Sequence, residues 1–228
     1  MVRPPGHHAT SRQAKGFCLF NNIAIATQYA LAQYELERIL IIDFDVHHGN
    51  GTQETFYDNP QVMYISTHLY PFYPGTGSVE ETGGGAAEGT NINIPLPAGC
   101  GDAEYLKVFE QIIVPAARRF QPQLILVSAG SDNHWADPLA LMEVSVTGFG
   151  QMARIIKGLA DELCGGRLVF TLEGGYNLSA LAASVKATFD ILLGNSSIDD
   201  PLGGSPRSFG ATDIDRLIGE IKEIHKLL

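Results

Sequence analysis

The chain contains 228 residues, 45% of them hydrophobic, and it carries a formal net charge of −10. This length can bury the core of one domain, and we expect residues 1–228 to form a single domain. The acidic charge and the lack of a basic stripe argue against direct nucleic-acid binding. No signal-peptide pattern and no apolar run of membrane-spanning length are present, so we expect no membrane contact. Three widely spaced cysteines, Cys18, Cys100 and Cys164, suggest no disulfide framework and favour a cytoplasmic location.

Apolar, β-branched runs alternate with helical patterns along the chain. In chain order, the sequence predicts a loop at 1–15, a helix at 21–34, a strand at 38–44, a strand at 62–66, a long loop at 69–89, a strand at 91–95, a helix at 102–120, a strand at 124–130, a helix at 147–163, a strand at 168–172, a helix at 178–193, a linker at 195–207 and an amphipathic helix near 214–224. This alternation predicts a three-layer α/β/α fold with a largely parallel sheet.

Individual residues suggest where the helices begin, bend and end. Asn21 or Asn22 could cap the first helix, and Asp102 is the expected cap of the second. Pro115 should kink that second helix, because proline has no backbone N–H and its ring crowds the preceding turn. The long loop after the second strand is of a length that is usually functional or mobile.

The first strand ends in a polar cluster that organises our functional reading. After four apolar residues come Asp43, Asp45 and His47, which would project to one side if the extended geometry persists. A carboxylate and an imidazole two residues apart, on a rigid edge, suit a divalent metal such as zinc. From spacing alone, a structural turn satisfied by hydrogen bonds explains the same residues equally well.

Other strand ends offer partners for this cluster, because open parallel sheets gather their chemistry at one edge. Asp132 follows the fourth predicted strand and Tyr176 follows the fifth, while His7 and His8 lie in the opening loop. A metal bound there could lower the pKa of water to about 7 and polarise a carbonyl. An imidazole could then transfer the proton, and Tyr176 could donate a hydrogen bond to the developing oxyanion.

Six ordered segments of the chain form recognisable motifs: Arg3 to Ala9, Gly16-Phe17-Cys18 with Asn21-Asn22, Asp43 to Gly51, Tyr73 to Gly77, Ser128 to Asp132 with Asp137-Pro138-Leu139, and Leu172 to Tyr176. Together they resemble the zinc-dependent histone deacetylase family, which has the arginase/deacetylase fold. The Pro-Pro-Gly-His-His form and Asn50 bring the chain nearer to the class II and bacterial amidohydrolase branch, which includes acetylpolyamine deacetylases. The resemblance implies a hydrolase of acyl-lysine peptides, acetylpolyamines or small esters.

The resemblance also implies roles for individual residues. Asp45, His47 and Asp132 match the zinc ligands, one ion per chain. Among the catalytic groups, His8 matches the general base and acid, His7 an electrostatic or proton-donating partner, Asp43 and Asn50 the residues that contact these two histidines, and Tyr176 the residue that polarises the carbonyl.

Further matches concern the substrate and a second ion. The acyl-lysine tunnel would be lined by Phe17 and Tyr73, with Gly16 and Gly174 beside it. A potassium site near the zinc would use Asp43, Ser66 and the Thr67 backbone, shared with Asp45 and His47. For Phe17 and Tyr73, ordinary core packing is the competing explanation.

The chain departs from the family at its beginning. The family carries a long N-terminal portion before the tandem histidines, whereas here they are residues 7 and 8. The chain is therefore expected to be a fragment or an N-terminally shortened form of the fold. An exposed sheet edge or apolar face should remain where that portion would pack, which predicts a homo-oligomer.

Two other functions compete with the deacylase. A two-metal ureohydrolase of the arginase type would need additional Asp and His ligands, and we find no Asp-rich motif that supplies them. A catalytically impaired zinc-binding remnant or interaction module is the alternative that the missing N-terminal portion suggests.

Overall fold

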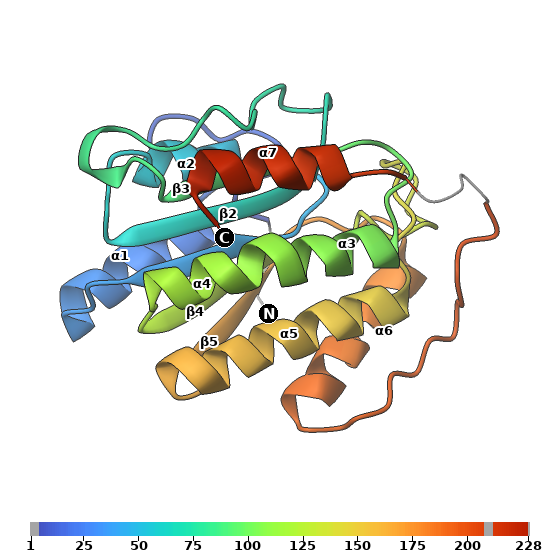
Figure 1. Ribbon diagram of the computed structural model, residues 1–228. Coiled ribbons are helices and arrows are strands. Elements are labelled where there is room, and N and C mark those ends of the chain that lie inside the picture. Colours follow the sequence, from blue (N-terminus) through green and yellow to red (C-terminus); the bar gives the residue numbers. More distant parts are fainter. Residues whose placement is uncertain (1–4, 208–211, 228) are drawn as a thin grey trace.

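A computed structural model describes residues 5–207 and 212–227, so Arg3 and Pro4 of the first motif lie outside the described residues. Five parallel strands form one sheet in the order β3-β2-β1-β4-β5 (Figure 1). Their bounds are β1 Ile39–Asp43, β2 Val62–Leu69, β3 Asn91–Leu96, β4 Leu124–Ala129 and β5 Leu168–Leu172. The predicted parallel sheet is confirmed, and β2 runs three residues further than its predicted end at residue 66.

Helices cover both faces of the sheet, which confirms the three-layer α/β/α architecture. One face carries α1 (Asn22–Tyr34) and α2 (Asn50–Phe56). The other face carries α3 (Asp102–Val108), the π-helical turn η2 (Phe109–Ile113), α4 (Val114–Phe120), α5 (Val146–Cys164) and α7 (Asp215–His225). The helix α6 (Leu178–Leu192) packs against α5, and η1 (Gly85–Ala87) is a short 3-10 turn in the long loop.

The central strand β1 separates two hydrophobic cores. Leu40 and Ile42 point toward the layer of α3, α5 and α7, whereas Ile39 and Ile41 point toward α1. All five residues of β1 are buried, as expected for a strand covered on both faces. In the register of the sheet, the last residue, Asp43, pairs with Ser66 of β2 and Ser128 of β4. The polar groups at the carboxyl ends of three neighbouring strands therefore meet.

The short helix α2 was not predicted from the sequence. Its residues include Gly51 and the β-branched Thr52, which are poor helix formers. The backbone N–H groups of Gly51 and Thr52 both donate to the carbonyl oxygen of His7, at 3.0 and 3.1 Å. This cap comes from a segment more than 40 residues away in the sequence, so no local signal could reveal it.

Two local predictions for the long helical segment need correction. The cap of α3 is Gly101 rather than Asp102, whose carboxylate instead accepts hydrogen bonds from the backbone N–H and the hydroxyl of Ser145, at 2.8 and 2.6 Å. The predicted kink at Pro115 takes the form of the π-helical turn η2 before it. A wider turn is a common answer to the missing proline N–H and the crowding by its ring. Asn21, by contrast, caps α1 as expected, with its side chain accepting from Ala24 N–H.

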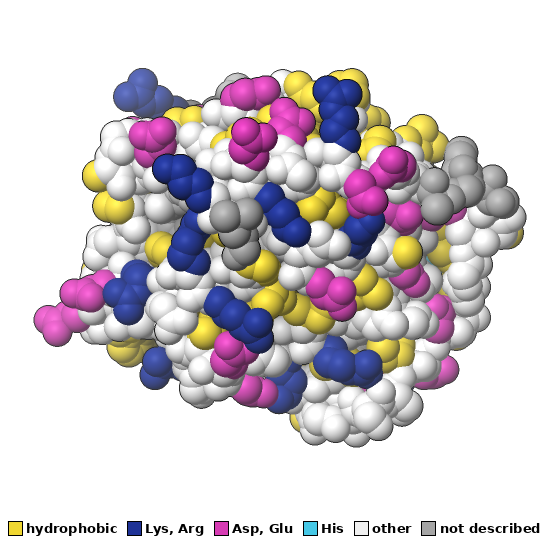
Figure 2. All heavy atoms as spheres, viewed as in Figure 1, with side chains coloured by type: hydrophobic (Ala, Val, Ile, Leu, Met, Phe, Trp, Pro, Cys, Tyr) yellow, Lys and Arg dark blue, Asp and Glu magenta, His cyan; other side chains and the backbone are white. Residues whose placement is uncertain are grey.

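β5 is one of the two edge strands of the described sheet. Val169 on this strand is 47% exposed, and Phe189 on the neighbouring α6 is 49% exposed. Self-association through this edge remains a prediction. Figure 2 shows Lys and Arg side chains interspersed with Asp and Glu over the face that carries α3, α4, α5 and α7, with no basic stripe. Within the described ranges, no helix is long and apolar enough to span a membrane.

Candidate active site

The turn after β1 delivers two of the predicted metal ligands. The strand ends at Asp43, whose carboxylate accepts the backbone N–H of Asp45 at 3.2 Å. The Asp45 carboxylate in turn accepts the backbone N–H of His47 at 2.8 Å. These hydrogen bonds between side chain and backbone fix the chain just after the strand, where it no longer pairs with its neighbouring strands. Phe44 and Val46 still pack in the core of the α3–α5 side, so the expected alternation of sides extends past the end of the strand.

Asp45, His47 and Asp132 converge as the sequence predicted. The Nδ1 atom of His47 lies 3.1 Å from an oxygen of Asp45 and 3.1 Å from an oxygen of Asp132. One ligand atom from each residue lies within 4.8 Å of the others. Zinc bound tetrahedrally at about 2.0–2.1 Å from each ligand separates the ligand atoms by about 3.3 Å. One nitrogen and two hard oxygens at this spacing fit a zinc ion.

Two glycines allow the carboxylates to approach the backbone closely. The N–H of Gly174 donates to Asp45 at 2.7 Å. A Cβ at Gly174 would lie 2.1 Å from an oxygen of Asp132, and a Cβ at Gly130 would lie 2.2 Å from an oxygen of Asp45. Any side chain at either position would displace a ligand. Gly174 therefore lies directly beside the proposed metal ligands, and its role in substrate binding stays a prediction.

The surroundings shift the pKa values of the three proposed ligand residues in different directions. Burial alone would lower the pKa of His47, but hydrogen bonds to Asp132 and Asp45 raise it to about 10. Burial and the charge of Asp45 raise the pKa of Asp132 to about 6. Burial opposes ionisation of Asp45 too, yet His7 and His47 hold its pKa below the usual range. Without a metal, a proton on His47 therefore compensates the two buried carboxylates.

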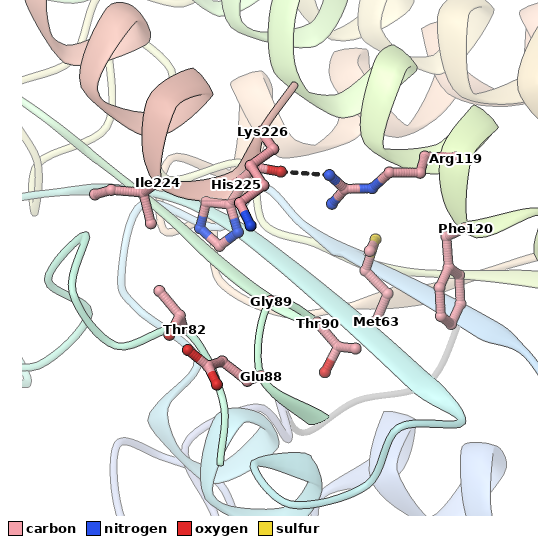
Figure 3. A pocket seen from close by; sticks show the side chains of 10 residues that line it. All are labelled: Met63, Thr82, Glu88, Gly89, Thr90, Arg119, Phe120, Ile224, His225 and Lys226. Atoms are coloured by element: carbon pink, nitrogen blue, oxygen red, sulfur yellow. Dashed lines mark hydrogen bonds between the residues drawn. The ribbon is translucent and has the colours of Figure 1, made fainter. Parts of the chain in front are cut away.

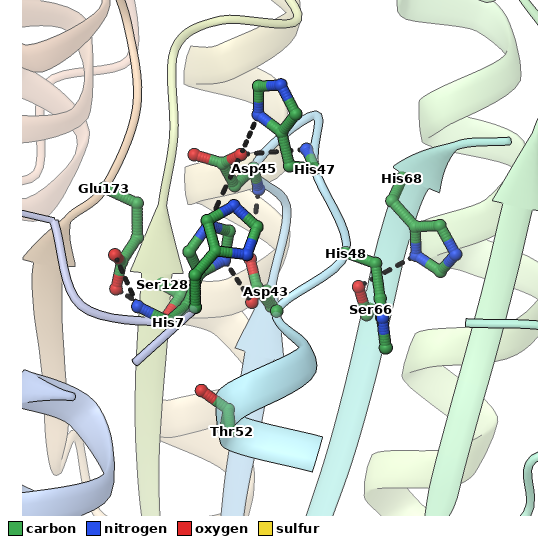
Figure 4. Close-up of polar contacts among 12 residues, drawn as sticks. His7, Asp43, Asp45, His47, His48, Thr52, Ser66, His68, Ser128 and Glu173 are labelled. Carbon is green, nitrogen blue, oxygen red and sulfur yellow. Dashed lines mark hydrogen bonds and ion pairs between the residues drawn. The ribbon is translucent and has the colours of Figure 1, made fainter. Parts of the chain in front are cut away.

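The tandem histidines lie beside this triad in two different charge states. His7 Nδ1 is 3.0 Å from Asp43 (Figure 4). The ring centroids of His7 and His8 are 4.1 Å apart. Burial would lower the pKa of His7, but Asp43, Asp45 and Glu173 raise it well above its ordinary value. Burial, with the charge of His7, lowers the pKa of His8 to about 2. His7 is therefore an imidazolium and His8 a neutral imidazole at pH 7.

Glu173 holds the loop that carries these histidines, a role that the sequence did not assign. One carboxylate oxygen accepts the backbone N–H groups of Gly6 and His7, at 2.6 and 3.1 Å. The other accepts the hydroxyl of Ser128 at 2.9 Å. Tyr64 was also missed: its hydroxyl donates to Asp43 at 2.9 Å, on the same oxygen that His7 contacts. No local sequence pattern indicates either role, because the groups that Glu173 and Tyr64 contact are distant from them in the chain.

The amide of Asn50 contacts His8 Nδ1 at 2.9 Å, as predicted. With its nitrogen toward His8, its oxygen accepts from Gly51 N–H at 3.2 Å and from Lys15 Nζ at 3.1 Å. The opposite orientation would place the amide nitrogen against these two donors, so we assign the nitrogen to the His8 side. Neutral His8 then accepts at Nδ1 and carries its proton on Nε2.

Tyr176 is positioned through its backbone. The side chain of buried Asp137 accepts the backbone N–H groups of Tyr176 and Asn177, at 2.7 and 3.0 Å. These two hydrogen bonds connect the Asp137-Pro138 segment to the loop that carries Tyr176. The ring of Phe17 lies edge-on to Tyr176, with centroids 6.0 Å apart.

Aromatic side chains form the rim above the histidines. Tyr73 lies edge-on to His8 at 5.0 Å between centroids, and Phe72, which the sequence analysis missed, stacks on His47 at 5.5 Å. Phe17 and Tyr73 are 74% and 47% exposed, so they are not ordinary core residues. Gly16 fits against His8, where a Cβ would lie 2.3 Å from the ring. These surroundings agree with the predicted substrate-binding positions, whose role remains a prediction.

The predicted potassium ligands lie close together, although their role is untested. Ser66 pairs with Asp43 across the sheet. Its hydroxyl lies 3.0 Å from Nδ1 of His68, and the buried hydroxyl of Thr67 has no hydrogen-bond partner within the described ranges. The Nε2–H of His68 donates to the carbonyl oxygen of Gly77, 2.9 Å away. Potassium binding stays a prediction.

Comparisons with known proteins agree with this geometry. The model of the histone deacetylase domain matches residues 1–192. The chain is 52% identical to histone deacetylase 10, chloroplastic, of Oryza sativa subsp. japonica, over 88% of this chain and 46% of that protein. It is 43% identical to a probable deacetylase of Archaeoglobus fulgidus, over 99% of this chain and 65% of that protein.

A solved structure shows the same fold. The crystal structure of the HDA15 HD domain superposes with a TM-score of 0.84 at 39% identity, covering 98% of this chain and 60% of that one. The chain therefore spans about half of its rice relative and less than two thirds of the archaeal protein and of the solved domain.

Proposed function

Because this chain belongs to the histone deacetylase family, we propose that it is a zinc-dependent hydrolase that removes acetyl or related acyl groups from amines. Acyl-lysine peptides and acetylpolyamines are the proposed substrates, and simple acyl esters undergo the same acyl transfer. One observation carries this proposal. Asp45, His47 and Asp132 form a group with metal-ligand spacing, and they lie directly beside the tandem histidines His7 and His8.

The chain's own residues divide the proposed reaction between them. Zinc, held by Asp45, His47 and Asp132, would supply Lewis acidity and lower the pKa of water. His7, fixed as a cation by Asp43, stabilises negative charge that develops on the substrate carbonyl. The Tyr176 hydroxyl donates a hydrogen bond to the same oxygen, since Asp137 holds its backbone in place.

Proton transfer falls to His8, the neutral member of the pair. In the assigned Asn50 orientation Nδ1 of His8 accepts a hydrogen bond and Nε2 carries the proton. To act as a base at Nε2, His8 must carry its proton on Nδ1, and the Asn50 oxygen must then face it. In that tautomer Nε2 takes a proton from the attacking water, and the resulting imidazolium donates this proton to the leaving amine. Turning the Asn50 amide is therefore part of the proposed reaction.

A turnover panel with metal analysis tests the proposal. We expect about one zinc per chain and hydrolysis of at least one class among acetyl-lysine peptides, acetylpolyamines and p-nitrophenyl acetate. One zinc without turnover of any class would instead support the impaired remnant. Two manganese ions would support the ureohydrolase, although the described residues contain one metal-binding group of the required kind.

Metal binding should release protons, and this can be measured directly. Metal-free His47 keeps its proton at pH 7 because its pKa is raised to about 10. A bound metal needs the neutral imidazole, so binding at pH 7 should release about one proton. Apparent affinity should then rise about tenfold per pH unit toward that pKa. Calorimetric titration with zinc in buffers of different ionisation enthalpy measures the release. Zero released protons would contradict the charge state assigned to His47.

Lys15 should restrain the Asn50 amide, and its removal should raise activity. In Lys15→Met, the amide oxygen loses one hydrogen bond to a cation and turns more easily toward His8. We expect kcat to rise about two- to tenfold, because the free energy of one hydrogen bond corresponds to a change in rate of this size. Steady-state kinetics on the best substrate of the panel measures this, with Arg12→Met, an exposed cation of the same loop, as control. Equal kcat in wild type and Lys15→Met would remove Lys15 from the mechanism.

A further inference from the structure

A pocket lies at the opposite end of the sheet from the proposed metal ligands. Its lining includes Met63 at the start of β2, Thr90 just before β3, Phe120 at the end of α4 and His225 at the end of α7. The metal ligands follow the carboxyl ends of the strands, whereas this pocket adjoins their amino ends. Its volume is about 630 Å³, which is within the range of small-molecule sites. Nothing in the proposed hydrolase mechanism uses it.

A buried histidine without a partner faces this pocket. His225 is only 4% exposed, and neither of its ring nitrogens has a hydrogen-bond partner among the described residues. Figure 3 shows its ring directed toward Thr82 and Glu88 across the pocket. Leaving a buried polar group unpaired costs about 1–3 kcal/mol, so such groups are rare unless something else satisfies them.

The charge around His225 favours a negatively charged ligand. Arg119 donates to the backbone carbonyl of His225, which fixes its guanidinium at the pocket wall (Figure 3). Lys226 adds a second cation beside it, in a chain whose net charge is −10. Burial, together with the charge of Arg119, lowers the pKa of His225 to about 4, although the nearby Gly89 backbone, which makes no hydrogen bond of normal geometry with the ring, opposes this. The ring is therefore neutral at pH 7 and has one N–H to donate.

One carboxylate, Glu88, also lines the pocket. It is exposed, whereas His225 is buried. Arg119 and Lys226 are exposed too, but Arg119 is anchored to the His225 carbonyl, so two cations and a buried donor face this single carboxylate. A metal cation at this site would be repelled by Arg119 and Lys226. Guanidinium groups bind carboxylates and phosphates in preference to other ligands because their paired N–H groups match the paired oxygens.

We propose that this pocket binds a small molecule bearing a carboxylate or phosphate group, with Arg119 and Lys226 contacting the anion and His225 donating its N–H. The hydroxyls of Thr82 and Thr90 on the facing wall would contact the remainder of the ligand. The site is separate from the hydrolase site, so binding here does not depend on metal at Asp45, His47 and Asp132.

The test titrates inorganic phosphate and citrate separately, at constant ionic strength, and follows the His225 ring signals by NMR. We expect at least one of the two anions to shift these signals in a saturable way. Arg119→Gln should weaken that binding about tenfold or more, as loss of a charge-assisted contact does. Lys226→Asn should weaken it without removing Arg119. Asparagine suits the left-handed backbone of Lys226, whose φ is 53°.

Two variants distinguish a built site from general attraction to positive charge. Arg118→Gln removes the neighbouring guanidinium, which pairs with Glu162 instead, and should leave binding unchanged within about twofold. Glu88→Gln removes the opposing charge and should tighten binding. An absence of saturable shifts with both anions would overturn the proposal. An equal loss in Arg118→Gln and Arg119→Gln would do the same.

Discussion

Replacing His47 with alanine is expected to remove bound zinc and, with it, all measurable hydrolysis. His47 is the only nitrogen ligand of the proposed set, and it lies between the other two at 3.1 Å from each. The two remaining carboxylates cannot complete a zinc site with an open position for the substrate. Metal content of the purified protein and turnover of the panel substrates measure the two losses together.

The same substitution should also destabilise the metal-free protein. The His47 proton compensates the buried carboxylates of Asp45 and Asp132, and removing one partner of a buried charge network costs about 3 kcal/mol. Thermal unfolding of metal-free wild type and His47→Ala at pH 7 tests this. His225→Gln is the control, since His225 is also a largely buried histidine but lies at the other end of the sheet. Full zinc occupancy in His47→Ala would refute the ligand assignment.

Patterns local in sequence predicted most of the fold. The strand Ile39–Asp43 could be predicted from its apolar residues, because every residue of it is buried between two helical layers. Its polar end was visible because Asp43, Asp45 and His47 follow the strand without a break. Asp132 and Tyr176 follow other strands in the same way, so the rule that parallel strands gather their carboxyl ends placed them at one edge.

Features that depend on distant partners could not be predicted. The helix α2 begins where the carbonyl of His7 accepts two of its N–H groups, and its own residues are poor helix formers. The role of Glu173 depends in the same way on its contacts with Gly6, His7 and Ser128, all of them distant in the sequence. Asp102 is of a residue type that often caps helices, yet its carboxylate accepts hydrogen bonds from Ser145 instead.

The charge states of the two histidines are the finest detail that sequence could not supply. His7 and His8 are neighbours of the same type, and only their surroundings separate them. His7 lies among Asp43, Asp45 and Glu173, whereas His8 faces the neutral amide of Asn50 and the cation of His7. The pair therefore offers one fixed charge and one neutral proton carrier, because environment drives their pKa values apart.

Replacing Tyr176 with phenylalanine is expected to lower kcat about 10²–10³-fold, the usual effect of removing one oxyanion donor. The substitution removes only the hydroxyl, so the ring beside Phe17 and the backbone bond to Asp137 should persist. Zinc content should stay at the wild-type value, because Tyr176 is not among the three ligand residues. KM should change little, since the hydroxyl acts mainly on the oxyanion.

Tyr73→Phe provides the matched control, because it removes a hydroxyl from another tyrosine of the same rim, 5.0 Å from His8 between ring centroids. Its kcat should stay within about twofold of wild type. Asp137→Asn should show an intermediate loss of about tenfold, because a neutral side chain holds the backbone N–H groups of Tyr176 and Asn177 less firmly. Steady-state kinetics and zinc analysis on the three variants rank these effects. If Tyr73→Phe lost as much activity as Tyr176→Phe, the two hydroxyls would act through the packing of the rim, and Tyr176 would not be the oxyanion donor.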